Sequence, residues 1–277
     1  MTEIKFLYRA LKSIEPYLQD LILVGGFASL LYSVHEKTDN GDNPLLITYD
    51  VDLASEGEVA IKGEKSIHES LEDEGLKCEL VGKFEEPILK YYPTEKTDSE
   101  YYVEFLAPLF GSETKRNGKP DLTQKIQKDL SAQKLRYLDL LLHDTWTVHT
   151  SNLSDLQEYP DLAIKLPHPC MYIMQKMLTL SKRQPLDRNK DYAYIYQTLT
   201  YFRKDLKPLA HEYEKLISNI TWRKWYSRFL DIALEVFDSP VKDGPVEGSQ
   251  LLDDVTPQMI SSAVMNFVSN CPKTQIV

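Results

Sequence analysis

Two aspartates one residue apart, Asp50 and Asp52, follow a Gly25-Gly26 pair in the chain, and these residue types suit metal and phosphate chemistry. In an extended segment alternate side chains share a face, so both carboxylates point the same way while Val51 points into the core. Two like charges held this close repel each other unless a cation neutralises them. The pattern therefore predicts a divalent-cation site on one face of a strand.

The glycine pair predicts an anion site beside that strand. It follows the apolar run Leu21 to Val24, which is typical of a short buried strand, and precedes Phe27 to Tyr32, which has the apolar density of a packed helix. A strand that turns through glycines into a helix directs backbone N–H groups at whatever lies at the helix N-terminus. Phosphates at the glycines and a cation at the aspartates together indicate a nucleotide site.

The elements around this site predict an α/β (α+β) first domain with a mixed sheet, residues 1–166, and an all-helical second domain, residues 167–277. In the first domain the patterns predict helices over 4–18, 27–32 and 67–75, a polar turn over 39–43, and strands over 21–24, 45–53, 77–81, 88–92, 101–106, 146–149 and 162–166. In the second they predict helices over 171–182, 191–202, 208–217, 221–237 and 257–268, with a loop over 239–249.

Composition narrows the class of protein. The chain has 277 residues, 42% hydrophobic and 27% charged, which is ordinary for a globular protein. Its net charge of −10 argues against a broad, sequence-independent grip on nucleic acid but leaves a local basic patch open. No apolar run approaches a membrane span and the N-terminus lacks a signal-peptide pattern, so we expect a cytoplasmic protein with no membrane partner.

Cysteine and histidine do not indicate a metal site. Cys78, Cys170 and Cys271 are far apart and odd in number, so neither a zinc site nor a disulfide framework is predicted, and we expect reduced, partly buried thiols. The six histidines have no metal-ligand spacing, and His149 and His168 are interpreted as structural or surface residues.

Three segments taken in order, residues 23–26, 48–53 and 103–106, resemble the signature of the DNA polymerase β-like nucleotidyltransferase superfamily. The stretch from Leu166 to Asp191 is also similar to the helical part of stand-alone bacterial nucleotidyltransferases, which include abortive-infection type toxins. The resemblance extends over residues 21–199 and implies a nucleotidyltransferase domain followed by a helical domain.

The resemblance implies roles for five residues of the first domain. Asp50 and Asp52 would hold two Mg²⁺ ions, and Mg²⁺ is a hard cation usually shared between a few carboxylates and substrate phosphates. Glu104 would supply the third carboxylate, help to bind the second ion and activate the attacking hydroxyl. Gly25 and Gly26 would let the backbone approach the β- and γ-phosphates of an NTP.

Four further residues are candidates for nucleotide binding. Ser29, further along the glycine helix, could add a hydroxyl. Lys176 is placed by the resemblance to neutralise triphosphate charge, and Lys190 with Asp191 resembles a Lys-Asp pair that binds nucleotide or orients its helix. Two other interpretations stay open, because Lys176 could extend its charge to the surface and Asp191 could favour the helix dipole.

The chain departs from the family pattern at three places. The 23 residues 27–49 separate Gly26 from the first aspartate, where minimal members have about a dozen. Glu104 stands where Asp is commoner, and its extra methylene displaces the carboxylate oxygens. Tyr194 stands where relatives often carry a further Asp, three residues beyond the Lys-Asp pair.

Two classes of function follow. The first is an enzyme that transfers NMP from an NTP to an acceptor hydroxyl with pyrophosphate leaving, the acceptor being a tRNA end, a protein or a small molecule. The second is a nucleotide-binding regulatory or toxin-type protein that keeps the fold with little or no turnover. The basic residues nearest the predicted site, among them Lys182, Arg183 and Arg188, suit a tRNA end or the triphosphate equally.

Overall fold

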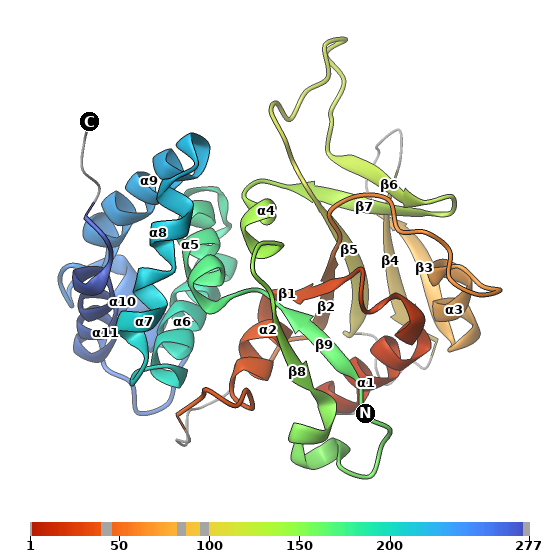
Figure 1. Ribbon diagram of the computed structural model, residues 1–277, viewed down its shortest axis with the longest axis horizontal. Coiled ribbons are helices and arrows are strands. Elements are labelled where there is room, and N and C mark those ends of the chain that lie inside the picture. The colour runs from red at the N-terminus through yellow and green to blue at the C-terminus, as the bar shows by residue number, and fades with distance from the viewer. Residues whose placement is uncertain (1, 40–45, 82–86, 95–99, 274–277) are drawn as a thin grey trace. The chain divides into compact units, whose positions relative to one another are not determined.

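The computed structural model describes residues 2–39, 46–81, 87–94 and 100–273. The chain divides into two compact units: Met1–Val34 with Ile47–His168, and His35–Leu46 with Pro169–Val277 (Figure 1). Residues 40–45 hold most of the predicted polar turn and the start of the predicted strand over 45–53, and they lie outside the described ranges.

The first unit combines α-helices with a mixed sheet. Its α-helices and 3-10 turns are α1 (Glu3–Ser13), η1 (Glu15–Tyr17), α2 (Gly25–Tyr32), α3 (Ile67–Asp73), α4 (Leu138–Leu141), η3 (Thr150–Asn152) and η4 (Ser154–Leu156). Its strands are β1 (Ile22–Val24), β2 (Asp50–Ala54), β3 (Leu76–Val81), β4 (Ile88–Pro93), β5 (Tyr102–Pro108), β6 (Thr123–Gln127), β7 (Leu130–Leu135), β8 (Trp146–His149) and β9 (Ala163–Leu166).

Strand β5 is the centre of the main sheet, whose order is β1-β2-β5-β4-β3. It pairs in parallel with β2 along one edge, while its other edge pairs first with antiparallel β4 and then with parallel β7. Strand β6 pairs with β7, and β8 with β9 forms a separate antiparallel ribbon. The parallel β2–β5 pairing matters most for function because it sets two stretches of strand in fixed register.

One face of the sheet is apolar and covered by helices. Val51, Phe105 and Tyr91 are at most 1% exposed and belong to this core. Helix α3 covers it, since the His68 ring nitrogen Nδ1 lies 2.9 Å from the hydroxyl of Tyr91. A capping box at Ser66 fixes where α3 begins. The alternate residues of β2 and β5 therefore project from the opposite face.

In the described residues of the second unit, all the regular elements are helices, and turns connect them. Its elements are α5 (Pro169–Thr179), η5 (Leu180–Lys182), α6 (Pro185–Tyr201), α7 (Leu206–His211), α8 (Tyr213–Ile217), α9 (Ile220–Phe237), α10 (Asp243–Ser249) and α11 (Pro257–Asn270). Helix α11 packs on α6, α7, α9 and α10. Asp39 is anchored here, because its backbone N–H donates to Tyr201 O at 2.7 Å and its carboxylate pairs with Lys204 Nζ at 2.7 Å.

The predicted fold class is confirmed: a mixed α/β first part precedes an all-helical second part. Several element boundaries were wrong. Residues 239–249 were predicted as a loop, yet α10 occupies Asp243–Ser249, where Gly244 packs too tightly for a side chain and Gly248 packs closely against Tyr192. The predicted helix over 208–217 is two short helices, α7 and α8, and the β6–β7 hairpin was not predicted.

Cys78, Cys170 and Cys271 are thiols and not parts of disulfide bonds, as expected. Burial raises the pKa of Cys170 well above its ordinary value and that of Cys271 to about 12, so both thiols stay protonated near neutral pH. Among the described helices, none is long and apolar enough to cross a membrane.

Candidate active site

A row of four paired residues crosses the polar face of the sheet. Val24 on β1 pairs with Asp52 on β2, Asp52 pairs with Glu104 on β5, and Glu104 pairs with Lys90 on β4. Residues paired across neighbouring strands project from the same face, with Cβ atoms about 5 Å apart. The register therefore brings together the two carboxylates that the sequence predicted on separate strands.

Asp50 joins the same face two residues before Asp52 and pairs with Tyr102. It is half-buried, and Thr48 Oγ1 donates a hydrogen bond of 2.7 Å to its Oδ1. Burial raises the pKa of the Tyr102 hydroxyl, and the charges of Asp50, Glu104 and Asp52 raise it further. All three predicted carboxylates thus act on the pKa of the same hydroxyl.

Gly25 lies directly against Asp52. Its φ of +67° belongs to the left-handed region, which glycine adopts without the strain that a side chain adds. A Cβ built on Gly25 would stand 1.9 Å from Asp52 Oδ2, far inside van der Waals contact. The backbone at this point therefore approaches the carboxylate as closely as only a glycine allows, and the glycine pair adjoins the predicted metal site.

Helix α2 begins at Gly25, so the glycine pair forms its first two residues instead of a turn before it. Within the described part of the chain, no side chain caps this N-terminus. The N–H groups and the dipole at a helix start attract anions. Ser29 is 1% exposed, and its hydroxyl has no hydrogen-bond partner among the described residues.

Lys90 extends the row on the far side of Glu104. Its Nζ lies 2.8 Å from Glu104 Oε2 and 3.9 Å from the centroid of the Tyr102 ring. The side chains of Lys90 and Glu104 are 20% and 12% exposed, so water screens this ion pair only partly.

These residues fit a hard divalent cation and a phosphate chain. Asp50, Asp52 and Glu104 offer carboxylate oxygens on one sheet face, which is the donor chemistry that Mg²⁺ prefers. The backbone at Gly25 lies against Asp52 at the start of α2, and the start of a helix is a favourable place for a phosphate.

The second unit holds the other three candidates. Lys176 and Asp191 are buried and paired, Nζ to Oδ1 at 2.6 Å, and Arg183 Nε lies 3.0 Å from Asp191 Oδ2. Lys176 Nζ also lies 5.0 Å from the ring centroid of Tyr194, the residue that replaces the family's further Asp. Lys190 is exposed. The charge of Lys176 is therefore already matched inside its own unit, and nucleotide binding by Lys176, Lys190 and Asp191 stays a prediction.

We expect Lys176→Met to destabilise the helical unit by about 3–5 kcal/mol, because removing one partner leaves a buried carboxylate poorly compensated. Urea unfolding followed by far-ultraviolet circular dichroism measures this loss. Lys207→Met, which removes an exposed lysine of the same unit, is the matched control and should change stability by less than about 0.5 kcal/mol. Equal midpoints for the two variants would contradict the expectation.

Sequence reasoning missed Lys90 and Thr48 as site residues. Lys90 alternates with apolar residues in the predicted strand over 88–92, but its partner became visible only through the β4–β5 register. Thr48 comes two residues before Asp50, a spacing at which a hydroxyl can reach the carboxylate. Two tyrosines of β4 are engaged within the sheet: Tyr91 is buried in the core, and Tyr92 packs on Tyr102 with ring centroids 5.5 Å apart.

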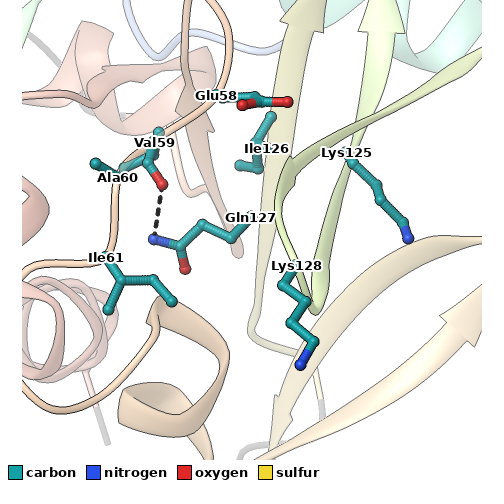
Figure 2. A pocket seen from close by; sticks show the side chains of 8 residues that line it. All are labelled: Glu58, Val59, Ala60, Ile61, Lys125, Ile126, Gln127 and Lys128. Atoms are coloured by element: carbon teal, nitrogen blue, oxygen red, sulfur yellow. Dashed lines mark hydrogen bonds between the residues drawn. The ribbon is translucent and has the colours of Figure 1, made fainter.

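A hollow of about 410 Å³ lies elsewhere in the first unit, lined by residues 58–61 and 125–128 (Figure 2). Gln127 crosses it and donates from Nε2 to Val59 O at 3.1 Å, while its Oε1 accepts from the Ile67 N–H at 2.9 Å. The amide thus ties the segment after β2 to α3 and β6. None of the predicted site residues lines this hollow, and Gln127, which does, has a structural role through its two hydrogen bonds.

Comparison with known proteins identifies a family. A family model described as "Nucleotidyltransferase" matches residues 3–218. A crystal structure of an antigenic nucleotidyltransferase-like protein from Paracoccidioides brasiliensis is 15% identical, with a TM-score of 0.35, over 78% of this chain and 91% of that one. No curated protein matches.

Proposed function

This chain belongs to the nucleotidyltransferase family, and from that premise we propose that it transfers NMP from an NTP to an acceptor hydroxyl in a Mg²⁺-dependent reaction. The observation that carries the proposal is the contact of Gly25 with Asp52, which itself pairs with Glu104. It supports the proposal because the backbone that would bind phosphate, the carboxylate that would bind metal and the carboxylate that would accept the proton are neighbours.

Asp50, Asp52 and Glu104 would hold the metal. When bound, Mg²⁺ would supply charge neutralisation at the phosphate oxygens. The N–H groups at the start of α2 and the Ser29 hydroxyl would bind the β- and γ-phosphates.

Glu104 would take the proton from the hydroxyl group of the acceptor while the oxygen of that hydroxyl forms a bond to the α-phosphorus. The bond from the α-phosphorus to the bridging oxygen breaks, and its electron pair leaves with pyrophosphate. Most of the rate enhancement would come from holding the acceptor and phosphates in line. The hydrogen bond from Thr48 would help to orient Asp50, and the packing against Gly25 would help to orient Asp52.

Three acceptors are proposed: a tRNA end, a protein or a small molecule. We also propose that the chain is related to the stand-alone bacterial nucleotidyltransferases of the abortive-infection type. Incubating the protein with each of four α-labelled NTPs, Mg²⁺ and cell lysate distinguishes the acceptors by whether label enters RNA, protein or a small molecule. We expect one class to be labelled with release of pyrophosphate. Glu104→Gln should remove the label, and label that survives this change would contradict the role of Glu104.

The second candidate function is a nucleotide-binding protein without turnover. The ion pair of Lys90 with Glu104 favours it, because it engages the carboxylate proposed as the proton acceptor. Tight NTP binding with no labelled product over long incubation would select this alternative. Turnover that is lost in Glu104→Gln would exclude it.

A further inference from the structure

Lys90 brings a positive charge to the row of carboxylates. It lies in register with Glu104, which lies in register with Asp52, so three adjacent strands carry a lysine and two acids on one face. Asp50 adds a third carboxylate from the same face. Three carboxylates and one ammonium leave a formal charge of −3 + 1 = −2 among these four side chains.

Two partners hold the ammonium of Lys90 in place. Its Nζ lies 2.8 Å from Glu104 Oε2 and 3.9 Å from the Tyr102 ring centroid, a cation–π distance. Tyr102 in turn pairs with Asp50, so the lysine contacts neighbours of both metal-binding aspartates. The ammonium therefore adds a local positive charge beside the carboxylates.

We propose that Lys90 is a positioning residue that holds Glu104 and limits how tightly the three carboxylates bind a divalent cation before nucleotide arrives. This inference rests on the proposed function of the same site. The ammonium repels a cation at the carboxylates and competes for Glu104 Oε2. A site of formal charge −2 balances one divalent cation, so a second one binds well only when the phosphates of an NTP add negative charge.

The consequence is an ordered site. Without nucleotide, the aspartates bind one cation while Lys90 holds Glu104. With nucleotide, the triphosphate compensates for Lys90 and the third carboxylate becomes a ligand. Lys90 would thereby prevent an empty site from accumulating two metal ions.

Titration calorimetry of Mn²⁺ without nucleotide tests this inference on the full chain. We expect Lys90→Met and Lys90→Gln to bind Mn²⁺ about tenfold more tightly than wild type, or with a second ion per chain, because the repelling charge is gone. Lys90→Arg keeps the charge and should bind as wild type does. Lys77→Met removes an exposed lysine from the same face of neighbouring β3, and it should also leave binding unchanged.

Unchanged or weaker Mn²⁺ binding in both neutral variants would overturn the role of Lys90. Lys90→Gln keeps the test valid if Lys90→Met fails to fold, and thermal unfolding of each variant checks folding. Asp52→Asn separates this inference from the proposed function. If wild type and Asp52→Asn bind Mn²⁺ equally, the metal site itself is wrong; if only the lysine variants show no effect, the function stands and the inference fails.

Discussion

Replacing Asp52 by Asn is expected to lower NMP transfer by at least about a thousandfold, because it removes one charge from the carboxylates proposed to bind the metal. Asp52 is 7% exposed and in contact with Gly25, so the isosteric amide should preserve packing. Initial rates with labelled NTP and the Mg²⁺ dependence of those rates measure the effect. The loss should appear in kcat at saturating Mg²⁺.

Asp73→Asn is the matched control for this prediction. Asp73 ends α3 in the same unit, and its side chain is 57% exposed beside Lys65. An exposed ion pair contributes little to stability, so this change should leave both fold and rate near wild type. Retention of more than a tenth of the activity by Asp52→Asn would show that Asp52 is not a metal ligand.

Replacing Gly25 by Ala is expected to lower transfer by about a hundredfold or more and to lower the melting temperature. The left-handed backbone at Gly25 costs a residue with a side chain about 1–2 kcal/mol, and the new methyl group would overlap Asp52 Oδ2. Relief of that overlap has to move either the carboxylate or the start of α2, and a displacement of about 1 Å suffices for a loss of this size. Differential scanning calorimetry and initial rates measure the two effects.

Gly57→Ala provides the comparison for Gly25→Ala. Gly57 lies in the same unit, and a Cβ built there meets nothing within 4 Å. This variant should keep both its melting temperature and its activity. Normal activity in Gly25→Ala would mean that the backbone at Gly25 does not bind the phosphates.

The carboxylates could be predicted from the sequence because their strands have strong local patterns. Alternation placed Asp50 and Asp52 on one face, and Val103 and Phe105 marked a strand that carries Glu104 outward. What brought Glu104 beside Asp52 is the parallel β2–β5 register, a contact between residues 52 apart in the chain that no local pattern encodes.

The same limit explains what was missed. Lys90 is an ordinary strand lysine until β4 aligns it with Glu104. Lys176 and Asp191 were considered separately from the sequence, and only the packing of α5 on α6 shows that their charges are matched to each other. Helix α10 was predicted as a loop because its glycines normally break helices, whereas here they allow close packing against Val236 and Tyr192.

The attachment of Asp39 to Tyr201 and Lys204 has a consequence for how the two units could be separated. The chain passes between units three times, after Val34, Leu46 and His168. The chain segment that joins α2 to β2 is therefore divided between the two units, and its residues 35–46 belong to the helical unit. A protein truncated after residue 168 would lack Tyr201 and Lys204, the residues that bind Asp39. An exchange of helical units among relatives therefore has to include residues 35–46 as well.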